Sequence, residues 1–268
     1  LPGVYLAHST GDFPGLLADT MGKVLRAEYA LAPSTYQRWC RVTTAPDYKE
    51  IKMLQLSEAA DLVEIPEGEE YTYGTLTESK ETYKLSKYGK GIKFTREMLI
   101  NDDLSAFDRV PRMMARAALR KVEGLAIAVL TDNAALSDGA QLFSTAHGNL
   151  ATGVINVDNL AAARALMRRQ TALGSDDPLE LMPRFLIVPE SKAVTAEQLV
   201  ASTVDPEKSN ATPNPFVNRL EVISSARLDI NSTTQWYLAA DPADIDTVVV
   251  AFLEGEETPV VEEEDEFD

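Results

Sequence analysis

Hydrophobic residues recur at helical spacing in several parts of the chain. Apolar positions three and four residues apart predict a helix over residues 16–31, which a following proline ends. The same spacing predicts a longer helix over 111–131, where Pro111 suits the first turn because an N–H there would have no helical partner. Shorter helices are predicted over 158–173 and 193–201. The long helix would measure about 30 Å, enough to form the backbone of a domain.

Between residues 43 and 95 the pattern changes to alternating apolar and polar positions. This alternation predicts strands in extended hairpins with one or both faces in water. A breaker, Pro66-Glu-Gly, divides the region. Tyr88-Gly-Lys-Gly91 lies between two strand-like runs, so we interpret it as a hairpin turn rather than a phosphate-binding loop.

The outer part of this hairpin region is too polar and too thin to bury much of its own surface. Acidic side chains occupy Glu64, Glu67, Glu69, Glu70, Glu78 and Glu81. We interpret the region as a projecting arm that packs on a neighbouring molecule; the alternative is a solvated edge of an ordinary sheet. The candidate contact residues of the arm are Glu67, Glu69, Glu70, Tyr71 and Tyr73.

The second half of the chain alternates loops with short elements. Over residues 133–222 this favours a compact α+β unit, in which the apolar run 185–188 is a buried strand. The polar, proline-rich stretch 204–216 is expected to be an exposed loop. Further strands are predicted over 220–223, 235–239 and 247–253.

Composition is that of an ordinary globular protein of one or two domains, with 268 residues, 45% hydrophobic and 25% charged. Cys40 is the only cysteine, so the chain has no intramolecular disulfide and no CxxC motif, which fits synthesis in a reducing compartment. No apolar stretch is long enough for a membrane span, and the first residues lack the order of a signal peptide. Because the chain begins without methionine, we expect a processed form or a start within a longer reading frame.

The chain is acidic, with 25 Lys and Arg against 42 Asp and Glu, a formal net charge of −17. It is therefore not a general DNA-binding protein, and any contact with nucleic acid should be local and weak. One cationic feature is periodic, because four arginines share a face of the long predicted helix. They are Arg109, Arg112, Arg116 and Arg120. They form either a solvated face with salt bridges to acidic neighbours, or an inter-subunit ion-pair stripe or a surface near packaged DNA.

Catalytic motifs are scarce. His8 and His147 are the only histidines, and His147 has Ser144 three residues away but no G-x-S-x-G elbow. We therefore interpret His147 as a loop histidine that hydrogen-bonds backbone, with a hydrolase as the alternative. The sequence indicates no metal ligand set, no cofactor motif and no enzyme.

Four stretches, in the same order along the chain, point to a known family. They are Tyr88-Gly-Lys-Gly-Ile-Lys-Phe-Thr-Arg-Glu-Met-Leu-Ile-Asn-Asp-Asp-Leu-Ser-Ala-Phe107, Arg109-Val-Pro-Arg112, Leu142-Phe-Ser-Thr-Ala-His-Gly-Asn149 and Trp236-Tyr-Leu-Ala-Ala-Asp-Pro242. Together they resemble the major capsid proteins of tailed bacteriophages, especially the branch in which a head-maturation protease can be fused ahead of the capsid sequence.

The resemblance implies an α+β Hong Kong 97-type capsid fold. In that fold residues 1–40 would be the N-terminal arm, and 41–100 the E-loop hairpin with strands of the peripheral domain. Residues 101–132 would hold the spine helix of the peripheral domain and 133–222 the axial domain. Residues 223–268 would supply strands that return to the peripheral domain and an acidic C-terminal segment.

The resemblance also implies self-assembly of pentamers and hexamers into an icosahedral shell that encloses double-stranded DNA. Implied partners are other copies of the chain, a portal, a scaffold or a head-maturation protease, and no membrane. The implied location is the virion capsid, assembled in the cytoplasm of the bacterial host. The alternatives are the shell of an encapsulin-like nanocompartment or of a gene-transfer particle. No lysine lies between Lys52 and Lys80, so a lysine cross-link from the hairpin tip is not expected.

Overall fold

Helices and strands are mixed along the chain, as the sequence predicts. The computed structural model describes residues 12–56, 78–91, 104–172, 177–208 and 211–261. In these ranges the elements are α1 (Asp12–Leu31), α2 (Tyr36–Trp39), β1 (Arg41–Ala45), β2 (Ile51–Leu56), β3 (Glu78–Tyr83), α4 (Leu104–Asp132), α5 (Val157–Arg168), β4 (Pro183–Pro189), the 3-10 turn η1 (Glu190–Lys192), α6 (Ala193–Ala201), β5 (Glu221–Ser225), α7 (Ala226–Asn231), β6 (Tyr237–Ala240) and β7 (Val249–Leu253).

A three-stranded sheet separates two hydrophobic cores. β4 is its central strand, parallel to β5 and antiparallel to β6. Successive strand residues point to opposite faces, so Phe185 and Ile187 enter one core while Leu186 and Val188 enter the other. Burial on both faces explains why this strand is a continuous apolar run.

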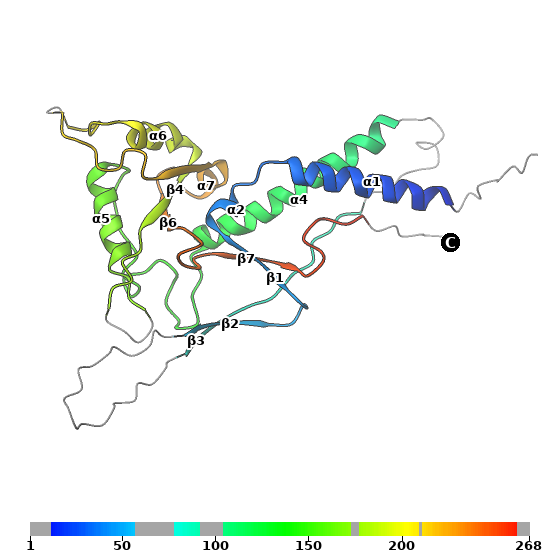
Figure 1. Cartoon of the computed structure of the whole chain (residues 1–268), viewed down its shortest axis with the longest axis horizontal. Helices are drawn as coiled ribbons and strands as arrows, with labels where there is room; N and C mark the ends of the chain where they lie inside the picture. The colour runs from blue at the N-terminus through cyan, green and yellow to red at the C-terminus, as the bar shows by residue number, and fades with distance from the viewer. Residues whose placement is uncertain (1–11, 57–77, 92–103, 173–176, 209–210, 262–268) are drawn as a thin grey trace, which may run out of the picture.

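Each core is closed by its own helices. On one face α2, α7 and the second half of α4 cover the sheet, through residues that include Trp39 and Ile127. On the other face α5 and α6 cover it, with Leu160 and Leu199 buried. The result is a helix, sheet and helix arrangement at one end of the molecule (Figure 1).

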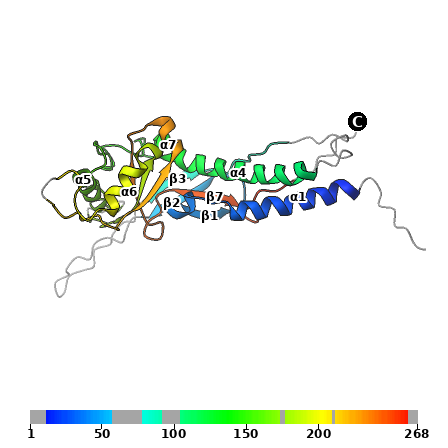
Figure 2. The same ribbon diagram turned by 90° about the horizontal axis from the view of Figure 1, so that it is seen from above.

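The other end of the molecule is formed by two long helices. α1 and the first half of α4 lie side by side in both views and run in the same direction (Figures 1 and 2). The sequence predicted α4 to begin at Pro111, but the helix begins at Leu104 and Pro111 lies inside it. Pro111 is the eighth residue of α4, so its missing N–H removes one hydrogen bond inside the helix, a local cost that the packing of α4 against α1 offsets.

The remaining described strands form two pairs. β1 pairs in parallel with β7, so Arg41 lies opposite Val249. β2 and β3 form an antiparallel pair in which Leu56 lies opposite Glu78. The antiparallel pair confirms strands on both sides of the breaker Pro66-Glu-Gly, whereas the breaker itself lies outside the described residues.

One prediction in this region was wrong. β3 ends at Tyr83, and residues 84–91 have no regular secondary structure, so Tyr88-Gly-Lys-Gly91 does not directly follow a strand. The last two strands join different sheets. β7 pairs with β1, but β6 pairs with β4, because its alternate apolar residues complete both cores.

The stretch 204–216 is more firmly anchored than its polar composition indicates. Asn214 is buried, and its side-chain amide donates to the carbonyl of Leu199 at 2.6 Å while its oxygen accepts from the N–H of Phe216 at 2.9 Å. Asp205 and Phe216 are buried as well. The expectation of an exposed loop was therefore wrong for these residues, because their polar groups are satisfied inside the fold.

Gly153 lies in the irregular segment before α5. Its φ is 141°, and a Cβ atom at this position would lie 2.4 Å from Nδ2 of Asn159. We expect Gly153→Ala to lower the free energy of unfolding by about 1–3 kcal/mol in chemical denaturation. Gly139→Ala is the matched control, because Gly139 also has a positive φ, of 83°, but faces open space. Equal losses in the two variants would show that the contact with Asn159 contributes nothing.

Candidate assembly surfaces and the His147 loop

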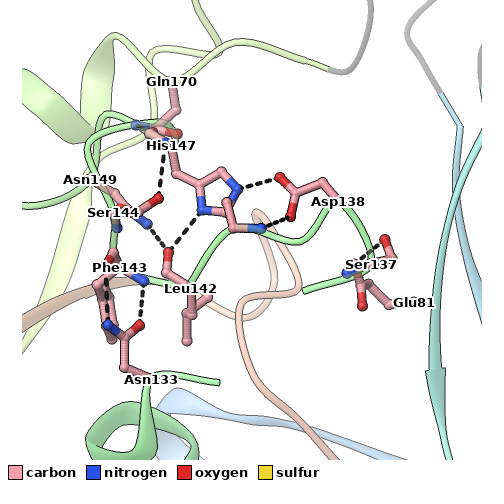
Figure 3. Close-up of polar contacts among 11 residues, drawn as sticks. Glu81, Asn133, Ser137, Asp138, Leu142, Phe143, Ser144, His147, Asn149 and Gln170 are labelled. Carbon is pink, nitrogen blue, oxygen red and sulfur yellow. Dashed lines mark hydrogen bonds and ion pairs between the residues drawn. The ribbon is translucent and has the colours of Figure 1, made fainter. Parts of the chain in front are cut away.

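The loop between α4 and α5 is held in shape by side chains of its own. The amide of Asn133 binds the backbone of Phe143 twice, donating to its carbonyl at 3.1 Å and accepting from its N–H at 2.6 Å (Figure 3). Asn133 has a φ of 45°, a conformation that asparagine tolerates better than most residues. Asn149 donates to the carbonyl of Leu142 at 2.7 Å. The sequence does not show which backbone groups these asparagines bind. An asparagine at each end of a loop does indicate contacts of this kind.

His147 lies at the centre of this loop with an oxygen atom opposite each ring nitrogen. Nδ1 lies 3.1 Å from the carbonyl oxygen of Leu142, and Nε2 lies 2.8 Å from the carboxylate of Asp138 (Figure 3). A neutral imidazole can donate from only one nitrogen, whereas the cation donates from both. The bond to Asp138, supported by the one to Leu142, therefore raises the pKa of His147. The same pair lowers the pKa of Asp138.

This geometry does not activate a nucleophile. The hydroxyl oxygen of Ser144 accepts a hydrogen bond from the backbone N–H of His147 at 3.3 Å, and neither ring nitrogen is directed to it. A general base needs a free ring nitrogen within reach of the hydroxyl that it deprotonates. The interpretation of His147 as a loop histidine that binds backbone is therefore confirmed.

Cys40 is not set up for nucleophilic chemistry either. Its side chain is buried, and this burial raises the pKa of the thiol to about 12. Within the described residues no three His, Cys, Asp or Glu side chains gather into a group that could bind a metal ion. Among the helices described, none is long and apolar enough to span a bilayer.

The arginine face of α4 is divided by its contacts. Arg116 donates to Glu28 on α1, with Nε at 2.8 Å and Nη2 at 2.7 Å, so it serves an ion pair within the chain. Arg109 and Arg120 are exposed, and neither makes a hydrogen bond or ion pair with any residue that the structure describes. Arg120 borders an open cleft between α1 and α4 that Glu28 and Glu123 also line. Arg112 is also exposed on this helix.

The acidic candidates lie elsewhere. Glu67, Glu69, Glu70, Tyr71 and Tyr73 all fall in the segment 57–77, outside the described residues. Glu81 of β3 is described, and it binds the loop of His147: its carboxylate accepts from the N–H of Ser137 at 2.9 Å and from the Ser137 hydroxyl at 2.5 Å. The sequence places Glu81 only on the acidic surface of the arm, because spacing does not reveal a partner 56 residues away.

Comparison with known proteins identifies the family of the chain. The sequence model of a family described as phage capsid protein matches residues 78–268. A search among curated proteins finds no match.

Solved capsid structures share the fold. A chain of the bacteriophage JBD30 capsid is 17% identical, with a TM-score of 0.63 over 74% of this chain and 91% of that one. The JBD30 capsid decorated with minor capsid protein trimers is 16% identical, with a TM-score of 0.59 over 73% of this chain and 91% of that one. The JBD30 procapsid is 18% identical, with a TM-score of 0.59 over 82% of this chain and 100% of that one.

These matches imply a structural, non-enzymatic role. At such low identity the solved structures establish the α+β fold, while the family model covers most of the sequence. The chain belongs to the phage capsid protein family.

Proposed function

We propose that this chain is the major capsid subunit of a tailed phage and that it assembles through pentamers and hexamers into an icosahedral shell around double-stranded DNA. The family match and the likeness to capsid and procapsid chains of JBD30 support this proposal. The shell would be the capsid of the virion, assembled in the cytoplasm of the bacterial host.

One observation carries the assembly proposal: β2 and β3 pack chiefly against each other (Figure 1). An isolated two-stranded pair is at best marginally stable in water. A neighbouring subunit that covers this pair would supply the missing contacts. Burial in that interface would stabilise two strands that pack chiefly on each other in the monomer.

The elements correspond to parts of a Hong Kong 97-type subunit in this proposal. The helix α4 takes the place of the spine helix, and the sheet β5-β4-β6 with α5 and α6 takes that of the axial domain. Residues 1–40, which include α1, would form the N-terminal arm. The segment 57–77 would form the E-loop, beginning and ending at the paired strands β2 and β3.

The candidate contacts follow from charge. The acidic side chains of the E-loop segment, Glu67, Glu69 and Glu70, complement Arg109 and Arg120 of α4 on a neighbouring copy, with Arg112 beside them. Tyr71 and Tyr73 would add aromatic contact area, which protein interfaces favour. We prefer this inter-subunit role to a DNA-facing one because the whole chain carries a net charge of −17.

Other partners of the shell would act during assembly. A portal, a scaffold or a head-maturation protease would contact the subunit in the proposed pathway, and packaged double-stranded DNA would touch it without sequence preference. A nanocompartment built on the same fold would differ in its contents, because it would enclose protein cargo and no genome. A gene-transfer particle is the further alternative.

Electron microscopy of the purified chain, with light scattering across a range of salt and protein concentration, tests the proposal. We expect shells, or five- and six-membered rings, with the wild-type chain. We expect Arg120→Glu to lower the yield of shells at least about tenfold, because the new carboxylate would repel the acidic segment of the neighbouring subunit.

Arg219→Glu is the control for net charge. Arg219 is exposed just before β5, and its substitution changes the total charge by the same amount. A wild-type chain that stays monomeric under all conditions would contradict self-assembly. Equal losses from Arg120→Glu and Arg219→Glu would contradict a specific role for the arginine face.

A further inference from the structure

The His147 loop joins three elements that are far apart in the sequence. Asn133 attaches it to the end of α4, as described above. Ser137 attaches it to Glu81 of β3, and Gln170, just beyond α5, donates from its side chain to the carbonyl of His147 at 3.1 Å (Figure 3). One loop therefore fixes the β2–β3 pair relative to the helices on either side.

We propose that the loop 133–149 is a latch that holds the β2–β3 pair against the α4–α5 junction, and that breaking the contact between Asp138 and His147 releases it. This inference rests on the proposed function, because its consequence would be to let the β2–β3 pair shift as a subunit enters or rearranges within a shell. It assigns a regulatory role to a histidine that the capsid family match leaves without one.

Asp138 connects the two halves of the latch. One of its carboxylate oxygens accepts from the N–H of Ala140 at 3.0 Å and holds a tight turn, in which the N–H of Gly139 donates to the carbonyl of Leu136 at 2.9 Å. The other oxygen binds His147 at 2.8 Å. Ser137 lies within the same turn, so a shift of Asp138 moves the group that binds Glu81.

Glu81 is well placed to transmit the latch to both strands. It lies near the middle of β3, and its Cα partner across the pair is Met53 of β2. Both hydrogen bonds from Ser137 go to the same carboxylate oxygen of Glu81. Hydrogen bonds to a charged acceptor are stronger than those between neutral groups, although exposure to water weakens them here.

Among the residues that the structure describes, few charged groups surround His147, so the pH dependence has a clear sign. Asp138 faces the ring from its own loop, the end of α5 presents the neutral Gln170, and β3 presents Glu81 to Ser137 rather than to the ring. Because folding raises the pKa of His147, the stabilisation of the latch by His147 is complete below pH 6.5 and is lost as pH rises through the raised pKa. Because folding lowers the pKa of Asp138, the stabilisation of the latch by Asp138 is complete above pH 3.8 and is lost as pH falls through the lowered pKa. The latch is therefore closed between these limits and loosens toward alkaline pH.

Hydrogen exchange of unassembled subunits, kept below the concentration at which scattering shows shells, tests the latch. We expect Ser137→Ala and His147→Gln each to raise the exchange rates of β2 and β3 amides by about threefold to tenfold. Ser86→Ala is the matched control, because Ser86 is exposed just beyond β3 and makes none of these contacts. We also expect the protection factors of β2 and β3 in the wild-type chain to fall between about pH 5.5 and about pH 8.5, and those of His147→Gln to stay level.

Two results would overturn the proposal. Unchanged exchange of β2 and β3 in His147→Gln would show that the histidine does not hold the pair, and so would a pH dependence that persists in that variant. Because these measurements use single subunits, they succeed or fail independently of shell formation. If exchange changes as expected but the yield of shells from His147→Gln has the same pH dependence as that of the wild type, the latch has no role in assembly.

Discussion

Replacing residues 57–77 with a two-residue Asn-Gly turn should give a subunit that folds but forms no shells. Leu56 and Glu78 are Cα partners at the end of the β2–β3 pair, so a short turn can join them without moving either strand. Asn-Gly favours the type I′ turn whose twist matches an antiparallel pair. Both described cores are built from residues elsewhere in the chain, so we expect little change in the free energy of unfolding.

Circular dichroism and urea denaturation would report the fold of this variant, and electron microscopy would report assembly. In a second variant, a Gly/Ser linker of the natural length replaces the segment. Comparison of the two variants shows whether assembly requires the side chains of the segment or only its length. Shells formed by the short-turn variant would contradict the assignment of this segment to the E-loop. Loss of the folded state would instead show that the segment stabilises the subunit itself.

Trp39→Ala should cause the largest loss of stability from a single substitution. Trp39 is 1% exposed and packs between α4 and the central sheet, next to the buried Tyr36. Removing so large a buried side chain leaves a cavity that costs about 3–5 kcal/mol. Urea denaturation of unassembled subunits, followed by circular dichroism, would measure the change.

Trp39→Phe is the informative comparison. The indole N–H of Trp39 is buried and has no hydrogen-bond partner within the described residues. An unpaired buried donor costs about 1–3 kcal/mol, so phenylalanine, which keeps an aromatic ring and removes this donor, should lose much less stability than alanine does. Equal losses from the two substitutions would contradict this account of the site. In both variants Trp236, which packs on the other core, remains as the only tryptophan and shows whether the two cores unfold together.

Elements with a strong local signal were predictable from the sequence. The apolar run at β4 and the helix α6 were both predicted, the latter with the bounds that the structure shows. Helix α5 ends at Arg168, earlier than the periodicity indicates, and α2 and α7 were missed because four and six residues are too few to show a period.

Contacts between distant residues were not predictable in the same way. Nothing in the composition of β1 indicates that β7 is its partner, because pairing between remote strands depends on how the whole chain is arranged. At the candidate site, the role of His147 as a backbone-binding residue was predicted, whereas its carboxylate partner Asp138 was not. For the arginine face both interpretations were open, and the contact of Arg116 with Glu28 settles that residue alone.

The pairing of β1 with β7 has a consequence for synthesis on the ribosome. β1 leaves the exit tunnel well before β7, so this sheet forms only when the helices and strands between them have emerged. Pairing across so long a sequence separation is slow, and the helices can form well before it. A nascent chain or a degradation fragment that lacks β7 leaves β1 unpaired, which makes incomplete subunits recognisable to chaperones and proteases before they can enter a particle.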